Sequence, residues 1–180
     1  MKSVLLTLLL AACAPIAESV RPLEPSEHGD MLLGPLRAAD ALLDPAGEPA
    51  QLARVRGVSG TIVVLTASFC DANTLEPLLS QAAALRKQGL EIVVVSLDHD
   101  PRALDGMVRP AEVAVLSAEA GARTALRAQT ILQTTLLLDA QGRQLRRYDG
   151  EVPLASLTGD LERVPEFVAR AANRQVLAKR

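Results

Sequence analysis

The feature that most constrains this chain is an apolar run over residues 60–67 that leads to a cysteine, Cys70. The run reads Gly-Thr-Ile-Val-Val-Leu-Thr-Ala, which is too short for a helix and rich in β-branched residues. This pattern predicts a strand that is buried on both faces of a sheet. Leucines and alanines then recur at helical spacing up to Gly89, with Asp71 as the expected N-cap and Pro77 as an expected kink. Cys70 is therefore expected at a strand-to-helix corner, where a helix N-terminus promotes the thiolate.

The rest of the chain supplies further strands and helices in alternation. Residues 91–97 repeat the buried-strand pattern, so strand, helix and strand make a right-handed βαβ unit. The remaining expected elements are an opening hairpin that turns at residues 45–47, a strand at 111–116, a helix at 119–128, a strand at 134–138, a return strand through Leu145 and Tyr148, and a closing helix from Pro153. This order predicts an α/β fold with a mixed central sheet and flanking helices.

Composition limits the partners of the chain. The 180 residues carry a net charge of −2, with one Tyr, two Phe and no Trp. There is neither a basic footprint nor a set of stacking aromatics, so no nucleic acid partner is expected. The length suits one domain of ordinary size.

The first residues have the plan of an export signal. Residues 1–12 combine one lysine, an apolar segment and small side chains, which is typical of a secretory signal peptide. The end of this segment, Leu-Ala-Ala followed by Cys13, resembles a bacterial lipobox. That resemblance implies acylation of Cys13, for example with palmitate, and an anchor that does not span the membrane. A plain signal peptide is the alternative. Ala14 after the cysteine resembles lipoproteins of an outer membrane, which implies its periplasmic face if the host is Gram-negative.

The domain organisation follows from these segments. Residues 13–36 contain four prolines and are predicted to be the lipidated cysteine and a flexible tether. Residues 37–168 are predicted to be the folded domain, and residues 169–180 the end of the closing helix and a basic tail. His28 in the tether and His99, between two aspartates, are each expected to be solvated, so no metal and no cofactor is expected.

Three phrases in this order resemble thioredoxin-like proteins. They are Leu43–Pro49, Val63–Cys70 and Thr134–Gly142, and the resemblance covers about residues 36–168. It is strongest to the tethered extracytoplasmic TlpA/ResA kind, with the AhpC/TSA (peroxiredoxin) and Sco branches as relatives. It implies a thioredoxin-like three-layer sandwich and thiol–disulfide chemistry at Cys70.

The chain departs from that family at two positions of the site. The redox-active members have a Cys-x-x-Cys pair, whereas residues 70–73 read Cys-Asp-Ala-Asn here. Those members also have a cis-proline opposite the pair, and Gln133 stands in the equivalent place. We therefore expect Cys70 to be the catalytic residue, in a degenerate site whose pocket is shaped by Asp71, Asn73, Gln133 and Thr134.

One thiol leaves three functions open. If Cys13 is acylated, Cys70 is the one remaining thiol and cannot close an internal disulfide. It can act as a monothiol on protein thiols and disulfides of the cell envelope, with an external resolving thiol. Alternatively, the chain is a redox-inactive binding or assembly protein of the envelope in which Cys70 is a small buried side chain. The third hypothesis is a one-Cys peroxiredoxin-like peroxidase that passes through sulfenic acid. A Sco-like copper site would need a second cysteine, so no metal is expected there.

Overall fold

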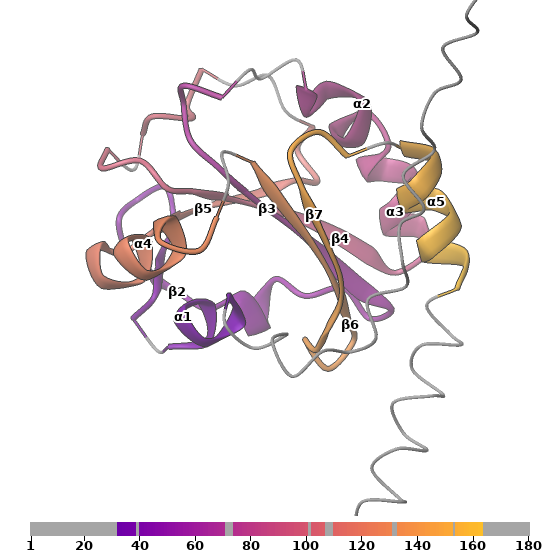
Figure 1. The fold of residues 1–180 in the computed structure, drawn as a ribbon, viewed down its shortest axis with the longest axis horizontal. Helices are drawn as coiled ribbons and strands as arrows, with labels where there is room; N and C mark the ends of the chain where they lie inside the picture. The colour runs from indigo at the N-terminus through magenta and orange to yellow at the C-terminus, as the bar shows by residue number, and fades with distance from the viewer. Residues whose placement is uncertain are drawn as a thin grey trace, which may run out of the picture.

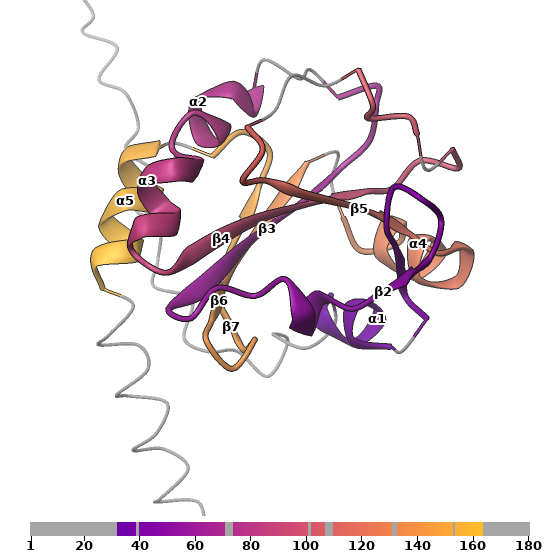
Figure 2. The same ribbon diagram turned by 180° about the vertical axis from the view of Figure 1, so that it is seen from behind.

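A seven-stranded mixed sheet forms the centre of the fold, and helices cover both of its faces (Figures 1 and 2). The computed structural model describes residues 32–38, 40–70, 74–100, 102–106, 110–130, 133–152 and 154–163. In chain order the elements are α1 (Leu33–Arg37), β1 (Leu42–Leu43), β2 (Pro49–Ala50), η1 (Leu52–Arg54), β3 (Gly60–Thr66), α2 (Glu76–Leu79), α3 (Ala82–Lys87), β4 (Leu90–Ser96), β5 (Ala114–Ala118), α4 (Ala120–Arg127), β6 (Thr134–Asp139), β7 (Gln144–Asp149) and α5 (Leu154–Glu162). The expected α/β architecture is confirmed.

The predicted buried strand is the middle of this sheet. The strand order is β2-β1-β5-β4-β3-β6-β7, with β5, β4 and β3 parallel and with β6 antiparallel to β3. All seven residues of β3 are buried, as the continuous apolar run predicted. In register, Thr66 at the end of β3 pairs with Ser96 at the end of β4. The loops that follow these two strands therefore leave the sheet side by side.

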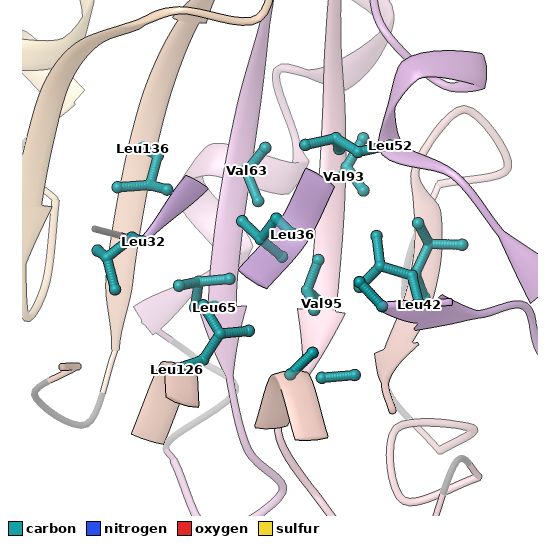
Figure 3. Packing of buried hydrophobic residues seen from close by; sticks show 14 of the residues in the cluster. Leu32, Leu36, Leu42, Leu52, Val63, Leu65, Val93, Val95, Leu126 and Leu136 are labelled. Atoms are coloured by element: carbon teal, nitrogen blue, oxygen red, sulfur yellow. The ribbon is translucent and has the colours of Figure 1, made fainter. Parts of the chain in front are cut away.

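Alternation along the strands divides the core into two layers. Successive side chains of a strand point to opposite faces, so Val63 and Leu65 of β3 pack with α1 and α4, whereas Ile62 and Val64 pack with α2, α3 and α5. Figure 3 shows the first layer, in which Leu36 lies over β3. This arrangement is a three-layer sandwich.

The first described helix corrects the predicted start of the folded domain. Leu32, Leu33 and Leu36 are buried in the first core layer, although the sequence pattern assigned them to the tether. Pro35 suggested a linker, but it lies in the first turn of α1. The backbone N–H that proline lacks would have no partner within the helix at this position. The folded part thus includes Leu32, and residues 1–31, with Cys13, lie outside the described residues.

The helical segment after Cys70 is divided differently from the expected single kinked helix. Residues 71–73 lie outside the described ranges, α2 starts at Glu76, and Pro77 falls in its first turn and not in a helix interior. The interruption comes instead at Ser80, whose Oγ donates to the Pro77 carbonyl (2.8 Å), while the N–H of Gln81 donates to Leu78 (3.1 Å). The segment is therefore two short helices, α2 and α3.

Other boundaries shift by a few residues. The strand expected at 111–116 is β5 (Ala114–Ala118), and the carboxylate of Glu119 then accepts from the N–H of Gly121 (2.8 Å) to cap α4. The β6–β7 hairpin and the opening β1–β2 hairpin are confirmed. Helix α5 continues through Gly159, and the basic tail at 169–180 lies outside the described residues.

Candidate thiol site

Cys70 lies in the loop that follows β3. Its N–H donates to the carbonyl of Ala67 (2.9 Å), which closes a turn directly after the strand. Cys70 as a residue is partly exposed and belongs to neither core layer, and its neighbour Phe69 is 69% exposed. Residues 71–73, which follow Cys70, lie outside the described ranges, so the expectation that a helix N-terminus promotes its thiolate stays a prediction.

A buried carboxylate holds the loop that carries Cys70. Asp98, which follows β4 and is 9% exposed, accepts from the Ser68 N–H at Oδ2 (2.7 Å) and from the Ser68 hydroxyl at Oδ1 (3.1 Å). The hydroxyl of Ser96 also donates to Oδ2 (3.0 Å). Between these contacts, the N–H of Leu97 donates to the carbonyl of Thr66 (2.7 Å) and extends the β3–β4 pairing. The ends of the two parallel strands are thereby joined through side chains.

Arg123 supports the same region from helix α4. Its guanidinium donates to the backbone carbonyl of Asp98 (2.8 Å) and to that of Ala118 (3.2 Å). From the sequence, neither Asp98 nor Arg123 was assigned a role. Asp98 reaches Ser68 because β3 and β4 pair in parallel. Residues that follow neighbouring parallel strands lie at the same edge of the sheet, and this rule could have indicated the contact from the sequence.

Gln133 lies just before β6 and is almost fully buried, at 6% exposure. Its side-chain carbonyl accepts from the Thr74 hydroxyl (2.7 Å), and its backbone carbonyl accepts from the N–H of Gly150 (2.7 Å). Both side chains line a pocket of about 240 Å³ together with Leu75, Pro77, Leu78, Glu151 and Val152. Among the described residues there is no cis peptide bond.

Of the other predicted pocket residues, Thr134 alone lies in the described ranges. Thr134 is fully buried, and its hydroxyl donates to Asp149 of β7 (2.8 Å). Its side chain thus ties β6 to β7 and is not part of the lining of the 240 Å³ pocket. Asp71 and Asn73 lie outside the described residues, so their roles stay predictions.

A second buried polar cluster joins β7 to α5. The guanidinium of Arg146 forms an ion pair with Asp160 (3.1 Å), and the hydroxyl of Tyr148 donates to the same carboxylate (2.7 Å). Burial raises the pKa of Tyr148, and the hydrogen bond to Asp160 and the negative charge of that carboxylate raise it further, while Arg146 acts in the opposite direction. The cluster fastens α5 to β7.

No group of three or more histidine, cysteine, aspartate or glutamate side chains in the described ranges is placed to hold a metal ion. The helices found there include none with the length and apolar character needed to cross a membrane.

Comparison with known proteins identifies the fold. No protein-family model and no curated protein matches the chain. A Chlorobium tepidum structure described as a thiol:disulfide interchange protein, DsbE, is 25% identical and superposes with a TM-score of 0.51, covering 73% of this chain and 91% of its own. A secreted disulfide oxidoreductase of Mycobacterium tuberculosis homologous to E. coli DsbE is 18% identical, with a TM-score of 0.55 over 72% of this chain and 97% of its own. The exposed lipoprotein thioredoxin Etrx1 of Streptococcus pneumoniae is 14% identical, with a TM-score of 0.54 over 68% and 96% of the two chains. The chain therefore has a thioredoxin-like fold.

Proposed function

We propose that this protein is an exported monothiol that exchanges disulfides with protein partners of the cell envelope through Cys70. The observation that carries the proposal is the position of Cys70, a partly exposed residue in the loop that follows the central strand β3 of a thioredoxin-like fold. Similar structures include a thiol:disulfide interchange protein and a disulfide oxidoreductase, which supports a redox role. Residue 73 is asparagine, so no second cysteine stands at the position where a Cys-x-x-Cys pair would have one.

The reaction has two balanced steps. The Cys70 thiolate attacks one sulfur of a partner disulfide, so a bond forms between Cys70 Sγ and that sulfur while the partner's own S–S bond breaks. The departing partner thiolate takes up the proton that Cys70 lost. An external thiolate then attacks the partner sulfur of the mixed disulfide, which releases the Cys70 thiolate and leaves a disulfide between the external thiol and the partner.

The anchor and the tether belong to the same proposal. Residues 1–12 act as the signal, Cys13 is acylated, and the segment from there to the buried Leu32 is the tether. The lipobox-like sequence supports this, as does the similarity to a lipoprotein thioredoxin. The test is the intact mass of the protein purified from the host envelope: an acylated N-terminal Cys13 is expected, and an unmodified Cys13 would refute the anchor.

Trapping of mixed disulfides in the host tests the monothiol role. Cells that produce the protein are treated with a membrane-permeant alkylating agent, and adducts are separated on a non-reducing gel. Adducts that disappear on reduction are expected for the unaltered protein and not for Cys70→Ser. If the two proteins give the same adduct pattern, Cys70 has no exchange role.

The exposed Phe69 favours a second candidate, a redox-inactive binding or assembly protein that uses the same surface. Such a protein would keep its partners when Cys70 is serine and lose them when Phe69 is removed. Chemical cross-linking of Cys70→Ser and Phe69→Ala in parallel separates the two functions.

A further inference from the structure

We infer that Asp98 is a positioning residue for Cys70, an inference that rests on the exchange function proposed above. The carboxylate is buried, and it holds Ser68, two residues before the cysteine, by both the backbone N–H and the hydroxyl. The Cys70 N–H donates to the Ala67 carbonyl and closes the turn of residues 67–70, while Asp98 holds Ser68 inside that turn. Asp98 thus sets where the cysteine leaves the sheet.

Asp98 is itself held rigidly. Its N–H donates to the Ser96 hydroxyl (3.2 Å), its carboxylate accepts from that hydroxyl, and its carbonyl accepts from the guanidinium of Arg123. These contacts come from β4 and α4, both parts of the central sandwich. A site that is fixed by hydrogen bonds to rigid elements keeps its geometry more precisely than a loop alone does.

The carboxylate accepts several hydrogen bonds at this position. Three donors converge on the two oxygens: the Ser68 N–H, the Ser68 hydroxyl and the Ser96 hydroxyl. Asparagine has nearly the same shape, and its NH₂ group can donate to the Ser68 hydroxyl, so Asp98→Asn can keep both contacts with Ser68 as weaker, neutral bonds. Asp98→Ala removes both side-chain bonds to Ser68.

Disulfide exchange is more sensitive to this loosening than alkylation is. Attack on a disulfide depends on access to one particular sulfur, and small misplacements of reacting groups lower such rates strongly. A small alkylating agent can approach the thiolate from several directions. The ratio of the two rate constants therefore reports position, whereas a change in thiolate population moves both rates together.

The experiment uses the full chain with Cys13→Ser, so that Cys70 is the one thiol. Second-order rate constants for glutathione disulfide and for iodoacetamide are measured over a pH series and compared on the high-pH plateau. For Asp98→Ala the exchange-to-alkylation ratio should fall on the order of tenfold. Ser68→Ala, which keeps the backbone bond, should lower the ratio by a smaller factor. The matched control is Asp100→Ala, since Asp100 is an exposed aspartate of the same loop, and its ratio should stay unchanged.

The outcomes are distinct. An unchanged ratio in Asp98→Ala, with only a lower melting temperature, would show that Asp98 merely stabilises the fold and would overturn the inference. If Asp98→Ala does not fold, Ser68→Ala decides: an unchanged ratio overturns the inference and a lowered ratio supports it. If the folded parent protein forms no mixed disulfide at all, the proposed function fails and the inference fails with it.

Discussion

The hydroxyl of Thr74 donates to the side-chain carbonyl of Gln133 over 2.7 Å. This bond joins the segment after Cys70 to the residue before β6, across 59 positions of sequence. Gln133 stands where the resemblance to thioredoxin-like proteins predicts a cis-proline, and a polar contact between side chains now occupies that position. The Thr74–Gln133 contact therefore links the residue before β6 to the segment that follows Cys70.

Removal of the Thr74 hydroxyl tests the strength of this contact. Thr74→Val keeps the shape of the side chain and leaves the nearly buried Gln133 carbonyl without this donor, so unfolding in urea should require about 1–3 kcal/mol less free energy. The matched control is Thr124→Val, since the exposed Thr124 bonds only within α4, and its loss should be about 0.5 kcal/mol or less. Equal losses in the two variants would mean that the Gln133 contact contributes nothing specific.

The buried ion pair between β7 and α5 should dominate the electrostatic stability. The Arg146 and Asp160 side chains are only 4% and 12% exposed, so Asp160→Asn removes one partner of a buried ion pair and should cost about 3–5 kcal/mol. At the pair of Arg86 and Glu91, where the arginine is 55% exposed, Glu91→Gln should cost about 0–1 kcal/mol. Chemical unfolding of both variants measures the difference, and a small effect of Asp160→Asn would contradict the role given to the pair.

The single tyrosine gives a direct test of the same cluster at alkaline pH. Burial and the hydrogen bond to Asp160 raise the pKa of Tyr148. The folded protein therefore keeps the phenol proton to a higher pH than the unfolded chain, which loses that proton at about pH 10. The stabilisation of the folded state by the protonated phenol is complete below that pH and is lost as the pH rises above it. Because the chain has one Tyr and no Trp, tyrosinate absorbance in native buffer and in urea reports both titrations. Coincident curves would show that the phenol is not held in the folded state.

Helix α1 should behave as part of the core. Leu36 is 1% exposed, so Leu36→Ala should lower the free energy of unfolding by about 2–5 kcal/mol. Val58→Ala, at a side chain that is 85% exposed, is the control and should change it by about 0.5 kcal/mol or less. If residues up to 36 formed a tether, the two variants would be equally stable.

The central part of the fold was predictable from the sequence because its signal is local. Residues 60–66 form a continuous β-branched run, and the run itself dictates a strand buried on two faces. The helix at Leu33–Arg37 was missed because Gly34 and Pro35 are typical of linkers, and only packing against β3 shows that their neighbours are buried. The break between α2 and α3 was also missed; there the Ser80 hydroxyl donates to the Pro77 carbonyl.

The site was predictable only in part. The cysteine was found by its place after the strand, but its support by Asp98 was not, because Ser68 and Asp98 are 30 positions apart. Their contact depends on the parallel register that pairs Thr66 with Ser96. Spacing along a sequence carries no information about such a register until both strands are placed in the sheet.

The most direct test of the central claim is the stoichiometry of Cys70 with a disulfide. The folded full chain with Cys13→Ser is incubated with glutathione disulfide and its intact mass is recorded, with Cys70→Ser in the same background as the control. The account predicts one glutathione bound per chain, released again by an added thiol, and none on the control. If the folded protein takes up no glutathione while the same chain in urea does, Cys70 is inaccessible in the native fold and the monothiol function is contradicted.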